Sequence, residues 1–309
     1  NLEGTSLLVA TGAANANISR TFARVPSDGL AELTIDVHGL TGAHIQFMER
    51  QLANAIKIIA RVLYYIARDV ECRVVSIDGG SVTTIPVQCT AKLALRSEDI
   101  DRAKEIAERV VSEVKHEHKE SDPGITLVLS NEDKAAPSIP ADISDSIIKL
   151  LHMLPSGLVD TSLVFPGLPI SSYSLETIAT TVDKLNIFYR PQSALTTKLF
   201  DMVEQTKELV ALYGADYAED NKFFGHCVDA HTPLYDVYDE VWFEQNGEHI
   251  RPIGAHYGNE IGFFMSNMPW LDMILLVATH YAAHTPDEKL DLASFDRCYK
   301  ALVEILARL

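Results

Sequence analysis

Apolar positions in the first 129 residues follow two kinds of spacing. Over 44–67 and 97–115 they recur at three- and four-residue steps, which predicts two amphipathic helices. Short apolar runs that contain β-branched residues, typical of strands, cover 72–77, 87–95 and 125–129. With a strand pair expected over 21–37, these elements give the β-α-β-β-α-β order of ferredoxin-like units.

A second tract has a similar alternation. Its predicted elements are a helix over 144–154, a hairpin over 175–190, a helix over 193–213 and a strand over 222–228. The stretch 130–143 is rich in Pro, Ala, Asp and Ser, so it is the expected linker between the two tracts. The pattern therefore predicts two related α+β halves.

The last part of the chain alternates helix and strand, which is typical of a parallel α/β sheet. The predicted elements are a helix over 233–245, a strand over 250–255, a short helix over 258–267, a buried strand over 271–279 and a helix over 294–309. In the last helix we expect Phe295, Tyr299, Leu302, Ile305 and Leu309 to face inward. Residues 6–11 are also strand-like.

Composition and charge narrow the possible partners. The 309 residues are 47% hydrophobic, enough for one large domain or two medium ones, and the formal net charge is −17. An acidic chain is repelled by phosphate backbones and anionic lipid, so we expect no nucleic acid and no membrane partner. The four cysteines are scattered without a C-x-x-C pair, which favours reduced thiols and a cytoplasmic location.

Histidines follow both predicted strands of the last part. His256 comes after 250–255, while His280 and His284 come after 271–279. Open α/β sheets bind ligands beyond the carboxyl ends of their strands, and imidazole is a favoured zinc ligand. An ordinary turn residue is the alternative for His284, because Thr-Pro-Asp-Glu follows it and spells a helix capping box.

Several motifs resemble those of the aminoacyl-histidine (Xaa-His, carnosinase-like) dipeptidases, a family of dinuclear zinc peptidases. His256-Tyr-Gly-Asn-Glu-Ile-Gly262 and Ala283-His-Thr-Pro-Asp-Glu288 are similar to that family's His-Ala-Gly-Leu-Glu-Cys-Gly and His-Ser-Pro-Asp-Glu. Gly39-Leu-Thr-Gly-Ala-His44 resembles its Gly-Leu-x-Gly-Gly-His. Phe188-Tyr-Arg190 is similar to Ile-Arg-Ser-Ser, and Asn1-Leu-Glu3 to Asn-Leu-Asp. In order and spacing these motifs span essentially the whole chain.

The resemblance implies a role for each matching residue. His284 would bind one zinc ion, and Glu3, at the family's Asp position, would bind the other. His44 would stabilise the oxyanion of the tetrahedral intermediate, and Arg190 would hold the substrate carboxylate. The residues implied to line the substrate pocket are His256, Gly258 and Glu260. We expect Glu3 and His284 at the same edge of one sheet.

The resemblance also implies the architecture. Residues 1–13 and 223–309 would be parts of an α/β catalytic domain, and 14–222 an inserted lid of two ferredoxin-like halves through which the protein forms a homodimer. The implied reaction is metal-dependent hydrolysis of Xaa-His dipeptides. Within this chain the family's His-x-Asp, bridging Asp and Glu-Glu pair do not occur, and the chain begins without Met. We therefore expect a fragment that is inactive by itself.

Two alternatives stay open. One is an N-acyl-amino-acid amidohydrolase on the same scaffold, although the long double lid favours the dipeptidases. The other is a non-catalytic dimerisation or ligand-binding protein.

Overall fold

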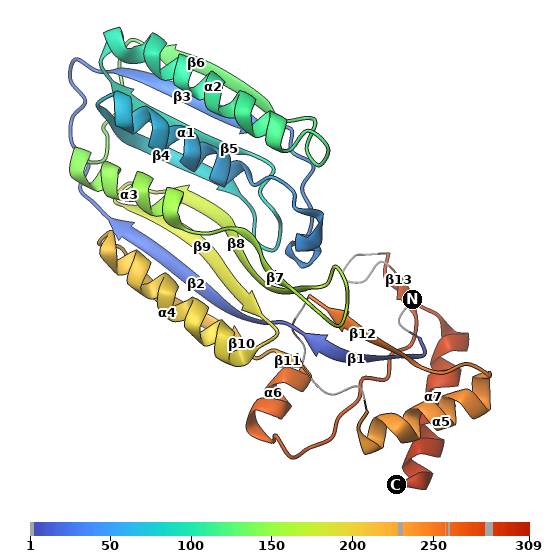
Figure 1. Ribbon diagram of the computed structural model, residues 1–309. Coiled ribbons are helices and arrows are strands. Elements are labelled where there is room, and N and C mark those ends of the chain that lie inside the picture. The colour runs from blue at the N-terminus through green and yellow to red at the C-terminus, as the bar shows by residue number, and fades with distance from the viewer. Residues whose placement is uncertain (1–2, 228–230, 257, 259, 282–286) are drawn as a thin grey trace.

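Two separate sheets organise the chain. The computed structural model describes residues 3–227, 231–256, 258, 260–281 and 287–309. Its strands form a nine-stranded sheet, a three-stranded sheet and a two-stranded ribbon. Figure 1 shows helices side by side over one face of the large sheet, and the smaller sheet with the last helices beyond one end of it. This arrangement confirms the expected mixed α/β fold. Among the described residues, no helix is long and apolar enough to cross a bilayer.

The first half of the large sheet is one ferredoxin-like unit. Its elements are β3 (Ala31–His38), η1 (Ile45–Arg50), α1 (Ala55–Asp69), β4 (Cys72–Gly80), β5 (Cys89–Leu95), η2 (Ser97–Asp99), α2 (Ile100–Glu117) and β6 (Thr126–Glu132). The strands lie in the order β6-β3-β5-β4, which is the 4-1-3-2 order of a split β-α-β unit.

The second half repeats this order with a strand taken from earlier in the chain. Its elements are β2 (Gly12–Thr21), α3 (Ala141–Met153), β7 (Gly157–Thr161), β8 (Pro169–Thr180), β9 (Lys184–Ser193), α4 (Thr196–Leu212) and β10 (Asp216–Phe223). The order β10-β2-β9-β8 is again 4-1-3-2. The first half is therefore inserted between β2 and α3, and β4 pairs with β8 to make one continuous sheet.

The strand pair expected over 21–37 is wrong. A turn does form there, because the Leu30 amide donates to the Ser27 carbonyl at 3.0 Å, but β2 pairs with β9 and β10 while β3 pairs with β5 and β6. The chain crosses between the halves at this point. Arg24 holds the crossing, since its guanidinium donates to backbone carbonyls of both halves, among them Val75 at 2.9 Å and Thr181 at 2.9 Å.

The helix expected over 44–67 is two helices. Gln51 has a left-handed backbone that ends η1, and the Asn54 side chain then accepts hydrogen bonds from the first amides of α1. Below this cap, α1 lies at the centre of the core, with fully buried apolar residues at Ile56, Ile59 and Leu63.

The small sheet combines a strand from the start of the chain with two strands from its last part. β1 (Thr5–Ala10) lies between β12 (Arg251–Ala255), to which it is parallel, and β11 (His226–Cys227), to which it is antiparallel. The remaining elements are α5 (Pro233–Asn246), α6 (Glu260–Asn267), β13 (His280–Tyr281), β14 (Lys289–Leu290) and α7 (Leu292–Arg308).

Two predictions for this part are wrong. Residues 271–279 form no strand and are mostly half-buried, because no described strand pairs with them. The inward face of α7 is Ser294, Cys298, Ala301 and Ile305, the stripe that packs against α5 and the core beside it. The other four predicted residues, Phe295, Tyr299, Leu302 and Leu309, are exposed.

Candidate functional site

Five of the predicted site residues line one cavity. Its volume is about 660 Å³, and Phe223, Phe224, Phe263 and Phe264 make much of its apolar wall. The predicted residues that line it are His44, Arg190, His256, Gly258 and Glu260. They come from the first half, the second half and the segment after β12, so three regions far apart in sequence meet at one cavity.

Arg190 projects from β9 and is held from behind by a buried acid. Its Nε lies 2.9 Å from Oε1 of Glu176, and its Nη2 donates to Oε2 at 3.4 Å. Glu176 on β8 has no exposed surface. Burial raises the pKa of this carboxyl, and the Arg190 charge and the Thr83 amide oppose that rise. The guanidinium also lies over the Phe188 ring, 5.4 Å from its centroid.

His44 stands at the start of η1 with a defined tautomer. Its Nδ1 accepts a hydrogen bond from the Gln46 amide at 3.2 Å, so the neutral ring carries its proton on Nε2. The backbone around it is tied to the β4–β5 connection, since the Ile45 amide donates to the Thr83 carbonyl at 3.0 Å and His44 pairs with Thr84. An exposed imidazole with an Nε2 proton is a suitable hydrogen-bond donor to a developing oxyanion.

His256 is a wall of the cavity whose two ring nitrogens are both used by the protein. It is 4% exposed; Nδ1 donates to the Pro169 carbonyl at 3.2 Å, and Nε2 accepts from the Ser172 hydroxyl at 2.8 Å. Burial lowers the pKa of this imidazole to about 4, so the ring is neutral at pH 7. Its contacts orient the strand end rather than offering a free acid or base.

Glycine is required where α6 approaches the small sheet. A Cβ at Gly262 would lie 1.9 Å from the Phe224 carbonyl oxygen, and a Cβ at Gly258 would lie 3.3 Å from that of Thr11. The close approach of α6 places Glu260, in its first turn, at the cavity. The predicted motif thus has a packing reason for Gly262.

Of the two predicted metal ligands, Glu3 lies among the described residues. Glu3 forms an ion pair with Arg297, whose Nη2 donates to Oε2 at 3.0 Å, and Thr279 contacts the same oxygen at 3.4 Å. The hydrogen bond from Arg297 lowers the pKa of Glu3. His284 and its predicted proximity to Glu3 lie outside the described residues. Within the described ranges there is no group of three potential metal ligands.

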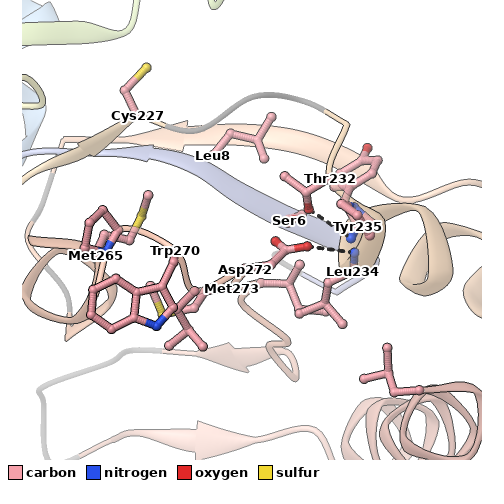
Figure 2. A pocket seen from close by; sticks show the side chains of 15 residues that line it. Ser6, Leu8, Cys227, Thr232, Leu234, Tyr235, Met265, Trp270, Asp272 and Met273 are labelled. Atoms are coloured by element: carbon pink, nitrogen blue, oxygen red, sulfur yellow. Dashed lines mark hydrogen bonds between the residues drawn. The ribbon is translucent and has the colours of Figure 1, made fainter. Parts of the chain in front are cut away.

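A second cavity, of about 850 Å³, lies beside β1 and α5. Figure 2 shows Thr232 and Asp272 directed at the first turn of α5, where they accept hydrogen bonds from the Tyr235 and Leu234 amides. The polar groups in this view therefore cap a helix. None of the described residues that line this cavity is a predicted site residue.

Comparisons with known proteins show what the sequence and the fold are similar to. Residues 27–122, most of the first half, match the family model for the M20 peptidase dimerisation domain. The chain is 25% identical over 282 residues to the cytosol non-specific dipeptidase of Escherichia coli (strain K12), which covers 90% of this chain and 58% of that protein. Residues 27–122 are therefore similar to the dimerisation domain of M20 peptidases. The resemblance of the chain to the aminoacyl-histidine dipeptidases is confirmed.

The fold of a solved dipeptidase extends over the whole chain. The crystal structure of an aminoacylhistidine dipeptidase from Vibrio alginolyticus superposes with a TM-score of 0.90 at 21% identity, covering 100% of this chain and 64% of that one. The chain therefore spans less than two thirds of the length of either relative. The functional roles of the seven predicted residues stay predictions.

The sequence reasoning missed Gln192, which lines this cavity, and Glu176, which contacts the lining residue Arg190. Glu176 occupies a strand of mostly buried residues, and Gln192 lines the cavity two positions after Arg190. Alternation along a strand is the signal that could have found Gln192, because residues two apart in β9 share a face.

Proposed function

We propose that this chain forms the substrate-binding cavity and the lid of a metal-dependent dipeptidase acting on Xaa-His dipeptides. The observation that supports the proposal most is the meeting of His44, Arg190 and Glu260 at one cavity. These residues were predicted from three separate motifs, and nothing in their spacing along the chain requires them to be neighbours.

The cavity has groups suited to a dipeptide. Arg190 presents a planar guanidinium, the geometry that pairs best with a carboxylate, at the end of the substrate. The Nε2 proton of His44 can donate to the oxygen of a carbonyl under attack. The four phenylalanines supply an apolar wall against which a side chain can pack.

Zinc belongs to the proposal only through the family resemblance. Two ions, when bound, would supply the activated water. His284 and Glu3 would be the ligands from this chain, although Glu3 is paired with Arg297 in the described structure. We propose further ligands and the general base from outside these 309 residues, because the chain spans only 58% of its dipeptidase relative. By itself the chain would then be inactive.

The domain division and the assembly follow the same proposal. Residues 14–222 would be the lid, and 1–13 with 223–309 parts of the catalytic domain. The match to a dimerisation domain over 27–122 supports a homodimer formed through the lid. The cytosolic relative supports a cytoplasmic location.

The test compares the complete natural protein with the 309-residue chain, both with added zinc. β-Alanyl-histidine should be hydrolysed by the complete protein and not by the short chain. N-Acetyl-histidine serves as the second substrate, and its preferential hydrolysis would favour the amidohydrolase alternative. No hydrolysis of either substrate by the complete protein would leave a ligand-binding protein.

Arg190→Ala in the complete protein tests the proposed clamp. It should raise KM for the dipeptide by a factor corresponding to about 2–5 kcal/mol, because a buried charge pair is lost, and should barely affect the C-terminal amide of the same dipeptide. Arg109→Ala is the control, since Arg109 forms an ion pair with Glu113 on the outer side of α2. An equal effect of Arg190→Ala on both substrates would contradict the clamp.

A further inference from the structure

Glu176 is a charged residue in the interior for which no motif predicts a role. It lies in β8 with no exposed surface, next to a cavity where a charged ligand is proposed to bind. An ionised carboxylate is costly to bury unless partners compensate for the lost water. Glu176 has two such partners, one in each half of the large sheet.

The first partner is Arg190. Nε and Nη2 of the guanidinium lie 2.9 Å and 3.4 Å from the two carboxylate oxygens. These contacts use one edge of the guanidinium fork. Among the described residues, Nη1 has no hydrogen bond to the protein, and Arg190 lines the cavity. A guanidinium anchored along one edge can offer its other donors to a ligand in a fixed direction.

The second partner is the backbone of the β4–β5 connection. The Thr83 amide donates to Oε2 of Glu176 at 2.6 Å, and Thr83 has a left-handed backbone with φ of 68°. A non-glycine residue in that conformation needs support from its surroundings. The Thr83 carbonyl in turn accepts from the Ile45 amide, next to His44. One carboxylate therefore joins the arginine of the second half to the loop that positions the histidine of the first half.

We propose that Glu176 is a positioning residue that orients Arg190 toward the carboxylate of the substrate and fixes the loop beside His44. This inference rests on the proposed function, because it assumes that Arg190 binds a carboxylate. It assigns carboxylate selectivity to a pair of residues, Arg190 and Glu176, of which only the arginine faces the ligand.

Glu32 offers a matched control for a merely structural role. It is 3% exposed in β3, lies 2.7 Å from the Lys92 ammonium, and accepts a hydrogen bond from the Ala136 amide at 3.2 Å. It thus has the same burial, the same kind of ion pair and the same kind of backbone contact as Glu176. Its partner Lys92 does not line the cavity, whereas Arg190 does.

The experiment uses Glu176→Gln in the complete protein, with a dipeptide and its C-terminal amide as paired substrates. The glutamine still accepts from the Thr83 amide but removes the charge that holds Arg190. We expect KM for the dipeptide to rise about tenfold, the scale of one hydrogen bond to a charged group. KM for the amide and both kcat values should change by less than about twofold on the same reasoning. Glu176→Asp keeps the charge, so it should raise KM for the dipeptide less than Glu176→Gln does. Glu32→Gln should leave both KM values unchanged.

A double variant and a binding measurement complete the test. In an Arg190→Ala background, Glu176→Gln should add nothing to KM, because the residue acts through the arginine. Calorimetric binding of L-histidine and L-histidinamide reads the same preference without turnover. The inference is wrong if Glu176→Gln weakens both ligands equally, or if Arg190→Ala abolishes the carboxylate preference and Glu176→Gln leaves it intact. Absence of peptide hydrolysis in the unmodified protein would overturn the proposed function instead.

Discussion

Protonation of His256 should make the chain lose stability in weak acid. The pKa of this imidazole falls from 6.5 to about 4 because the ring is buried. Above pH 6.5 the ring is neutral in both the folded and the unfolded chain, so stability is unaffected there. Between pH 6.5 and 4 the unfolded chain binds a proton that the folded chain does not, and unfolding becomes more favourable. One pKa unit corresponds to about 1.4 kcal/mol, so the loss over this range is about 3 kcal/mol.

The assay is urea unfolding of the 309-residue chain and of His256→Gln at several pH values from 7 to 4. Carboxylates and the other histidines titrate in both proteins, so the difference between them isolates His256. We expect the wild-type free energy of unfolding to fall by about 3 kcal/mol more than that of the variant. His116→Gln, at an exposed position of α2, is the control and should follow the wild type. Parallel pH profiles for wild type and His256→Gln would refute the reasoning.

Four further variants of the 309-residue chain test packing, each by its midpoint of chemical unfolding. Gly262→Ala should destabilise by about 1–3 kcal/mol, because the new Cβ would overlap the Phe224 carbonyl and push α6 away; an unchanged midpoint would contradict the close approach. Lys57→Met should lower the free energy of unfolding by about 2 kcal/mol, since the Lys57 ammonium donates to three carbonyls at the end of α3 within 2.9 Å. An unchanged free energy of unfolding would contradict the importance of these hydrogen bonds. Ile305→Ala should cost about 2–5 kcal/mol and Leu302→Ala less than about 1, because Ile305 is buried and Leu302 is exposed; similar costs for both would support the helix face predicted from sequence.

Local patterns predicted the elements of the large sheet but not how the strands pair. Helical and alternating spacing placed α2, α3 and the β8–β9 hairpin correctly, because each buries one face against the same core. The pairing of β2 depends on contacts with strands about 170 and 200 residues later, β9 and β10. A turn signal at 27–29 is equally compatible with a hairpin and with a crossing between two halves. Only the long-range contacts decide between them.

For α7 the helix was predicted correctly, but the side that faces inward was not. The large apolar residues of this helix suggested one inward stripe, but three of the four buried residues are small, namely Ser294, Cys298 and Ala301. Ile305 is the residue that the predicted and the observed stripe share. Helices that approach closely favour small side chains between them, so side-chain size misleads where packing is tight.

In the candidate site, some residues could be predicted from local motifs and others depend on contacts between distant parts of the chain. His44, Arg190 and Glu260 lie in motifs whose residue types indicate chemistry even when their neighbours are unknown. Glu176 has no such motif: within Ser174-Leu-Glu-Thr-Ile178 it looks like the outward-facing polar residue of an amphipathic strand. Its role depends on Arg190, 14 residues later, and on Thr83, 93 residues earlier. Residues proposed to contact a ligand can thus be predicted from a single sequence, whereas the residue proposed to position one of them is recognised only from the folded chain, where the partners of a buried charge can be identified.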